Sequence, residues 1–116
     1  MVGLTILTLV ALLLAIVRFP DSLQMGIAYE HANRAMTKGD PVAAAEGYSK
    51  VLDAYPNADD VRIDLFEAYT KSGDVPNAVK QFNYFHDRTI SKDQLARLDG
   101  IAGELGGKIQ TTVDSQ

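Results

Sequence analysis

The sequence contains no cysteine among its 116 residues. This absence excludes disulfide frameworks, thiolate metal sites, cysteine nucleophiles and a lipoprotein attachment cysteine. Clusters of basic residues are missing as well: the formal net charge is −4, and the 11 Lys and Arg residues are interspersed with acids. Phosphate binding requires clustered positive charge, so the pattern argues against nucleic acid as a partner and is typical of a solvated helical surface.

Groups for catalysis are sparse. Catalysis requires acid, base, nucleophile or metal-binding groups that converge on one pocket. His31 and His86 are far apart in the sequence, and neither has a second ligand at metal spacing. We expect His31 to pack at a helix crossing and His86 to lie on a solvated helix end. The sequence therefore predicts a protein that is not an enzyme, with no cofactor, no metal site and no small-molecule substrate.

The N-terminal segment carries no charge from Val2 to Val17 and consists mostly of Leu, Ile, Val and Ala. A membrane-spanning helix requires roughly 20 apolar residues, with a lower limit near 17. Residues 1–19 are therefore predicted to form a single-pass transmembrane anchor. Two alternatives remain. One is a cleaved signal peptide, which is less favoured because no Lys or Arg precedes the run and no small-x-small pair follows it. The other is a helix buried in a soluble core.

Two further features of this segment bear on its partners and its orientation. Thr8, Ala11 and Ala15 follow each other at i, i+3 and i+7, a spacing at which small residues let a second transmembrane helix approach closely. They are equally compatible with ordinary filling of an apolar span. Arg18 follows the apolar run, and the positive-inside rule then predicts that the rest of the chain lies on the cytoplasmic side.

The sequence repeats itself with a period of 34 residues. Gly39, Gly73 and Gly107 are separated by 73 − 39 = 34 and 107 − 73 = 34 positions. At the same offset, aspartate follows aspartate, alanine follows alanine and aromatic follows aromatic, as in Asp40 with Asp74, Ala44 with Ala78, and Tyr48 with Phe82. With its helix-turn-helix pattern, this period resembles the tetratricopeptide repeat, over residues 25 to 107. The chain departs from the family where Ala28 and Arg62 replace a tryptophan of the first helix.

The resemblance implies an all-α fold for residues 20–107. Two full repeats are expected at about 25–58 and 59–92, followed by a capping helix over 92–106. Leu95, Leu98, Ala102 and Leu105 form the apolar stripe of that helix and are expected to cover the end of the stack. Residues 108–116 are polar and are predicted to be a disordered tail.

Local start and stop signals agree with this organisation. Gly39 and Gly73 end predicted helices, because glycine adopts the left-handed conformation at low cost. The aspartate after each glycine caps the next helix, and a proline follows in its first turn, where the missing N–H is harmless. Ser91 and Gln94 form a capping box for the last helix. The glycine pair at 106–107 is expected to end it.

In stacked helix pairs the first helix of each pair lines the concave side. By resemblance to the family, the partner-binding residues on that side are Tyr29, Asn33, Met36, Ile63, Glu67, Thr70, Arg97 and Ile101. This mixture of aromatic, aliphatic, amide and oppositely charged side chains suits an amphipathic helix or an extended segment of a partner. The alternative is a shallow groove that neighbouring subunits cover.

The resemblance implies a protein–protein interaction module. Three functions fit the sequence. The favoured one is an accessory or assembly subunit of a larger membrane protein complex. The second is a membrane receptor or adaptor that captures a peptide or preprotein, and the third is a secreted or periplasmic soluble adaptor with a cleaved N-terminus.

Overall fold

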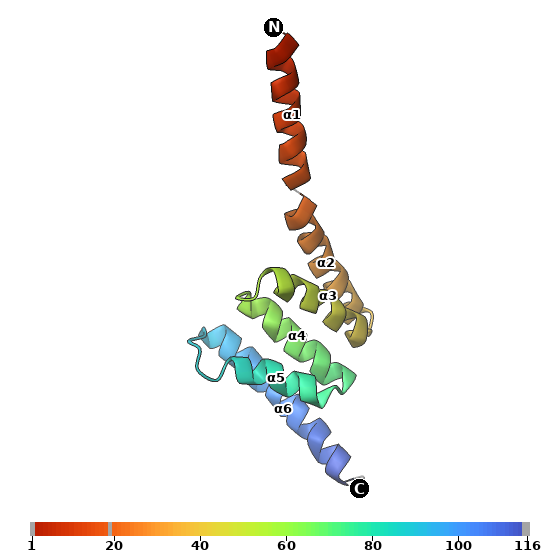
Figure 1. Ribbon diagram of the computed structural model, residues 1–116. Coiled ribbons are helices and arrows are strands. Elements are labelled where there is room, and N and C mark those ends of the chain that lie inside the picture. The colour runs from red at the N-terminus through yellow and green to blue at the C-terminus, as the bar shows by residue number, and fades with distance from the viewer. Residues whose placement is uncertain (1, 19, 115–116) are drawn as a thin grey trace.

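The computed structural model describes residues 2–18 and 20–114, and it describes side chains over residues 2–12 and 25–110. The described residues form six α-helices. These are α1 (Val2–Arg18), α2 (Pro20–Thr37), α3 (Pro41–Ala54), α4 (Asp59–Ser72), α5 (Val75–Tyr84) and α6 (Lys92–Asp114). Figure 1 shows α2 to α6 stacked in sequence order, with α1 pointing away from them. The all-α prediction is confirmed for the described part of the chain.

The α1 helix differs from the predicted anchor in length. It contains 17 residues and, at about 1.5 Å per residue, extends about 25 Å, whereas the hydrocarbon core of a bilayer is about 30 Å thick. None of the helices that the structure describes is both long and apolar enough to cross a membrane. The transmembrane anchor predicted for residues 1–19 is therefore not found in the structure.

The two turns that contain Gly39 and Gly73 follow the sequence signals. Gly39 and Gly73 have φ values of 82° and 79°, in the left-handed region that favours glycine. The Asp40 carboxylate accepts a hydrogen bond from the backbone N–H of Ala43 at 3.2 Å, and Asp74 accepts one from Asn77 at 3.4 Å. The predicted helix ends and N-caps are confirmed at both turns. The helix-ending glycines therefore recur 34 residues apart in the structure as they do in the sequence.

The last helix begins as predicted and ends later. The backbone N–H of Ser91 donates to Gln94 Oε1 at 3.0 Å, and the N–H of Gln94 donates to Ser91 Oγ at 3.1 Å, which confirms the capping box. The structure differs from the predicted end at the glycine pair 106–107 and, over residues 108–114, from the predicted disordered tail, because α6 continues to Asp114. Residues 115 and 116 of that predicted tail lie outside the described residues. One physical reason for the longer helix is Lys108. Its Nζ donates to the backbone carbonyls of Thr70 at 2.6 Å and Lys71 at 3.0 Å, which ties this part of α6 to the C-terminal end of α4.

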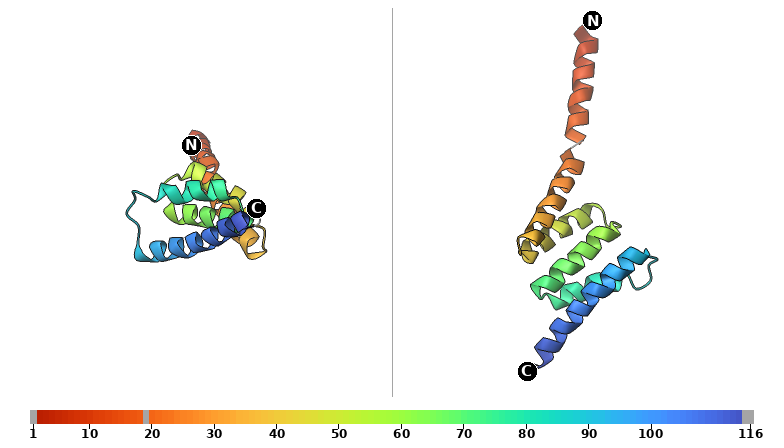
Figure 2. Two further views of the ribbon diagram at one scale, coloured as in Figure 1. Left: turned by 90° about the horizontal axis from the view of Figure 1, so that it is seen from below. Right: turned by 180° about the vertical axis from the view of Figure 1, so that it is seen from behind.

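The hydrophobic core consists of two clusters that share α4. The first lies between α2, α3 and α4 and contains the buried residues Ala32, Ala44, Ala45, Tyr48, Leu52, Leu65 and Ala68. The second lies between α4, α5 and α6 and contains Ile63, Phe66, Ala78, Phe85, Leu98, Ile101 and Leu105. Figure 2 shows α6 lying against α4 and α5. The repeat stack is therefore held together by the two opposite faces of α4.

The apolar stripe of α6 covers the stack with one exception. Leu98 and Leu105 are 3% and 6% exposed, whereas Leu95 is 50% exposed. The prediction that Leu95 joins the cover is wrong. It lies in the first turn of α6, one turn before Leu98, outside both core clusters.

Candidate functional site

A network of polar side chains joins α2, α4 and α6, the first helices of successive helix pairs. Its centre is Asp64, which is only 8% exposed. The Tyr29 hydroxyl donates to Asp64 Oδ2 at 2.8 Å. Arg97 Nη2 donates to Asp64 Oδ1 and, at 2.8 Å, to Glu67 Oε2. Burying a carboxylate is costly unless it has an ion pair and hydrogen bonds. Tyr29 gives Asp64 a hydrogen bond, and Arg97 gives it both a hydrogen bond and an ion pair.

A second branch of this network connects α2 with α3. The Tyr48 hydroxyl donates to Asn33 Oδ1, and the rings of Tyr29 and Tyr48 lie 5.8 Å apart at an interplanar angle of 57°. Burial raises the pKa of both tyrosine hydroxyls, and the negative charge of Asp64 raises them further. Both hydroxyls therefore stay protonated and act as hydrogen-bond donors at neutral pH.

The charged part of the network has an excess of negative charge. Burial opposes the charged form of Arg97, but hydrogen bonds with Glu67 and Asp64 outweigh that effect and raise the pKa of the guanidinium. One guanidinium thus faces two carboxylates. The face lined by α2, α4 and α6 is suited to a ligand that brings hydrogen-bond donors or positive charge.

The structure brings together four of the eight residues predicted for the concave side. These are Tyr29, Asn33, Glu67 and Arg97, which all belong to the network. Met36 is partly buried and packs against the first core cluster. Their role in binding a partner stays a prediction. Asp64, which links them, was missed.

The other three predicted residues are buried. Ile63 and Thr70 are 0% exposed and Ile101 is 6% exposed, because α6 packs against α4 at this point. They were expected on an open groove, and the structure places them inside the protein instead. Ile63 and Ile101 belong to the second core cluster, and none of the three residues offers an exposed surface.

The small-residue stripe of α1 is described only in part. Thr8 and Ala11 are exposed, and the Thr8 hydroxyl donates to the backbone carbonyl of Leu4, one turn earlier. The side chain of Ala15 lies outside the described residues. The packing of this stripe against another helix stays a prediction.

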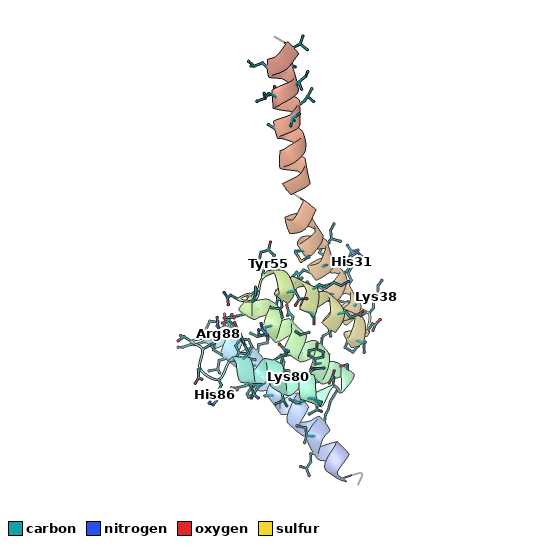
Figure 3. The ribbon with its side chains drawn as sticks, in the orientation of Figure 1. His31, Lys38, Tyr55, Lys80, His86 and Arg88 are labelled. Atoms are coloured by element: carbon teal, nitrogen blue, oxygen red, sulfur yellow. The ribbon has the colours of Figure 1, made fainter. Side chains whose placement is uncertain are left out.

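The two histidines are exposed and far apart (Figure 3). His86 lies after the end of α5, as expected, whereas His31 does not pack at a helix crossing but lies on the outer side of α2. In the part of the chain that the structure describes, no three His, Cys, Asp or Glu side chains are grouped to hold a metal ion.

The start of α4 carries a second cluster, built around Tyr84. The guanidinium carbons of Arg62 and Arg88 lie 3.9 and 4.6 Å from the centroid of the Tyr84 ring. The Tyr84 hydroxyl donates to Asp59 Oδ1 at 3.2 Å, and Arg88 pairs with the same carboxylate. Arg62, which stands where the family has a tryptophan, therefore still packs on an aromatic ring and links α4 to α5.

Comparison with known protein families decides the nature of this helical stack. Residues 35–83, from the last three residues of α2 through most of α5, match the tetratricopeptide repeat model. This segment is similar to a tetratricopeptide repeat. No curated protein and no solved structure matches the chain. Tetratricopeptide repeats are protein–protein interaction modules and typically non-catalytic scaffolds, so this similarity indicates a module for binding protein partners.

Proposed function

We propose that this chain is an accessory or assembly subunit of a larger membrane protein complex, in which the tetratricopeptide repeat and α1 contact the complex at two points. The observation that carries the proposal is the surface of α1. Over residues 2–12, where the structure describes the side chains of α1, the large apolar side chains are 50% to 81% exposed. They are Val2, Leu4, Ile6, Leu7, Leu9, Val10 and Leu12. A contiguous apolar surface of this kind indicates a protein or membrane contact.

The length of α1 favours a complex over a lone anchor. A helix of about 25 Å leaves the hydrophobic thickness of a bilayer unmatched, and packing against other helices is one way in which short apolar helices are accommodated. Ala11 offers a small side chain for a close approach. The Thr8 hydroxyl already has an acceptor within its own helix, which lowers the cost of placing it in an apolar environment.

The polar network of the repeat supplies the second contact in this proposal. Two carboxylates around one guanidinium favour a partner segment that carries lysine, arginine or free amide groups. Because both contacts belong to one chain, binding at α1 raises the effective concentration of the repeat near its partner. In this arrangement the repeat lies on the cytoplasmic side, which follows from Arg18 after the apolar run.

The test is purification of the full chain from membranes in a mild detergent, followed by native-size analysis and identification of bound proteins. We expect one or more integral membrane proteins at near-equal amount. Replacing Ala11 with Trp should loosen the association, because a large side chain blocks close helix packing. Tyr55→Ala, a change at an exposed position outside the network, serves as the control. A chain that migrates alone from membranes would contradict the subunit role and favour a receptor that binds its ligand transiently.

A further inference from the structure

We propose that the free end of the repeat stack binds an amphipathic helix of a different protein, with acidic residues beside its apolar stripe. The site is a groove of about 600 Å³ between α2 and α3, which we call the end groove. Its lining includes the small residues Ala28, Ala35 and Gly47, together with His31, Lys38 and Lys50. Figure 3 shows His31 and Lys38 on the outer side of α2, facing away from α4.

The internal repeat explains why a helix fits there. In the second repeat, α3 packs on one surface of α4, and the two helices together line two hollows. The α4 residues on this surface are Arg62, Leu65, Tyr69 and Ser72. Subtracting 34 from these four numbers gives Ala28, His31, Ala35 and Lys38, all of which line the end groove. The α2 surface in the end groove therefore corresponds, by the repeat, to the α4 surface that α3 covers.

Small side chains make this surface receptive to another helix. Where the second repeat has Leu65 and Tyr69, the end groove has His31 and Ala35. A Cβ built on Gly47 would lie 2.8 Å from the Cβ of Ala32, so α2 and α3 approach closely where these two residues line the end groove. A partner helix can come near the backbone there and fill the open volume with its own aliphatic side chains.

The charge of the end groove selects the partner. Its lining includes the cations Arg34, Lys38 and Lys50, and the anions Asp40 and Glu46, in a chain whose net charge is −4. Asp40 is already engaged as the cap of α3, and Arg34 has an ion pair with Glu30. Among the described residues, no ion pair is formed by Lys38, Lys50 or Glu46, so two cations and one anion of the lining are without an ionic partner. The two lysines therefore outnumber the remaining carboxylate. Lys38 and Lys50 are available to carboxylates of a partner.

The α1 helix of a second copy fits this site poorly. It carries no acidic residue between Val2 and Val17, so it cannot meet the two lysines. The α3 helix shows what would fit. Where α3 packs on α4, Glu46 of α3 and Ser72 of α4 line the same hollow. The residue equivalent to Ser72 in the first repeat is Lys38, because 72 − 34 = 38. A helix bound in the same pose would place a glutamate beside Lys38.

The probe for the experiment is therefore a helix-stapled, fluorescently labelled peptide with the sequence of residues 41–54. Its binding to the full chain in detergent micelles is measured by fluorescence anisotropy. We expect saturable binding that a scrambled peptide does not show. Changing Lys38 and Lys50 together to Glu should weaken binding at least about fivefold, because attraction becomes repulsion. The matched control changes Lys80 and Lys92 to Glu, which alters the net charge equally at exposed positions outside the end groove.

A charge exchange completes the test. A peptide carrying Glu46→Lys should bind the chain with Lys38→Glu more tightly than it binds the parent chain. Equal binding of the original peptide to the parent and to the Lys38 and Lys50 double variant would overturn the proposal. The proposal would also fail if Glu67→Gln in the polar network abolished binding while the lysine changes did not. It would fail as well if the original peptide bound no better than the scrambled peptide. The detergent purification reports on the polar network and α1, so the two proposals fail independently.

Discussion

Thr70 shows how one residue can be buried at a cost to the stability of the repeat. Its side chain is 0% exposed, and its hydroxyl oxygen has no hydrogen-bond partner in the part of the chain that the structure describes. Its backbone carbonyl, by contrast, accepts a hydrogen bond from Lys108. A buried hydroxyl without a partner loses its hydration and gains nothing in return.

Replacing Thr70 with Val should therefore stabilise the protein. Valine has nearly the same shape and lacks the hydroxyl, so the free energy of unfolding should rise by about 1 kcal/mol. Thr70→Ser is the matched control: it keeps the hydroxyl and removes the methyl group, and it should lower stability by about 1 kcal/mol. Chemical denaturation of the full chain in detergent measures both changes. A valine variant less stable than the parent would indicate that the hydroxyl has a partner in solution.

At the scale of single elements, the sequence correctly predicted the helix ends and caps that depend on short-range interactions. The turns at Gly39 and Gly73 and the capping box at Ser91 each depend on residues at most five positions apart, and all three are present. The end of α6 was mispredicted because it depends on Lys108, which contacts α4 across 38 positions of the chain.

The candidate site shows the same division. Four of its residues were named because the repeat register places them on the first helices of the pairs. Asp64 was missed, although it lies 64 − 29 = 35 residues after Tyr29 and 97 − 64 = 33 before Arg97. The burial of Ile63 could not be read from the register either, because it depends on how closely α6 packs against α4.

The α6 helix offers a paired test of its covering role. Leu98 is 3% exposed in the second core cluster, so Leu98→Ala should lower the free energy of unfolding by about 2 to 4 kcal/mol, through lost burial and a new cavity. Leu95 is 50% exposed on the same helix, and Leu95→Ala should cost less than about 1 kcal/mol. Denaturant titration compares the two. Equal costs would mean that α6 packs on the stack in a different register.

At the scale of the whole molecule, the chain places three different surfaces apart from one another. The molecule measures 77 × 30 × 20 Å, and α1 accounts for much of the long dimension (Figure 2). The exposed α1 is apolar, the polar network carries an excess of carboxylates, and the end groove carries unpaired lysines. Surfaces this distinct in chemistry can engage different partners at the same time, which suits a scaffold subunit.

The apolar surface of α1 makes a prediction about the intact chain. We expect the full chain to bind vesicles of neutral phosphatidylcholine, since burying a leucine side chain contributes about 1.5 to 3 kcal/mol. Changing Leu7 and Leu9 together to Gln should weaken this binding more than tenfold, as measured by co-sedimentation with the vesicles. Tyr55→Gln, at an exposed position on the repeat, is the control and should leave binding unchanged.

The same double variant separates the role of α1 from that of the repeat. Leu7 and Leu9 lie outside both core clusters, so the thermal unfolding of the repeat should not shift when they are changed. A fall in melting temperature together with the loss of vesicle binding would mean that α1 packs on the repeat in solution and is not free to bind lipid. Unchanged vesicle binding would mean that another surface contacts the lipid. Because the vesicles carry no net charge, the lysines of the end groove give little attraction to them, and any strong binding is assigned to apolar contact.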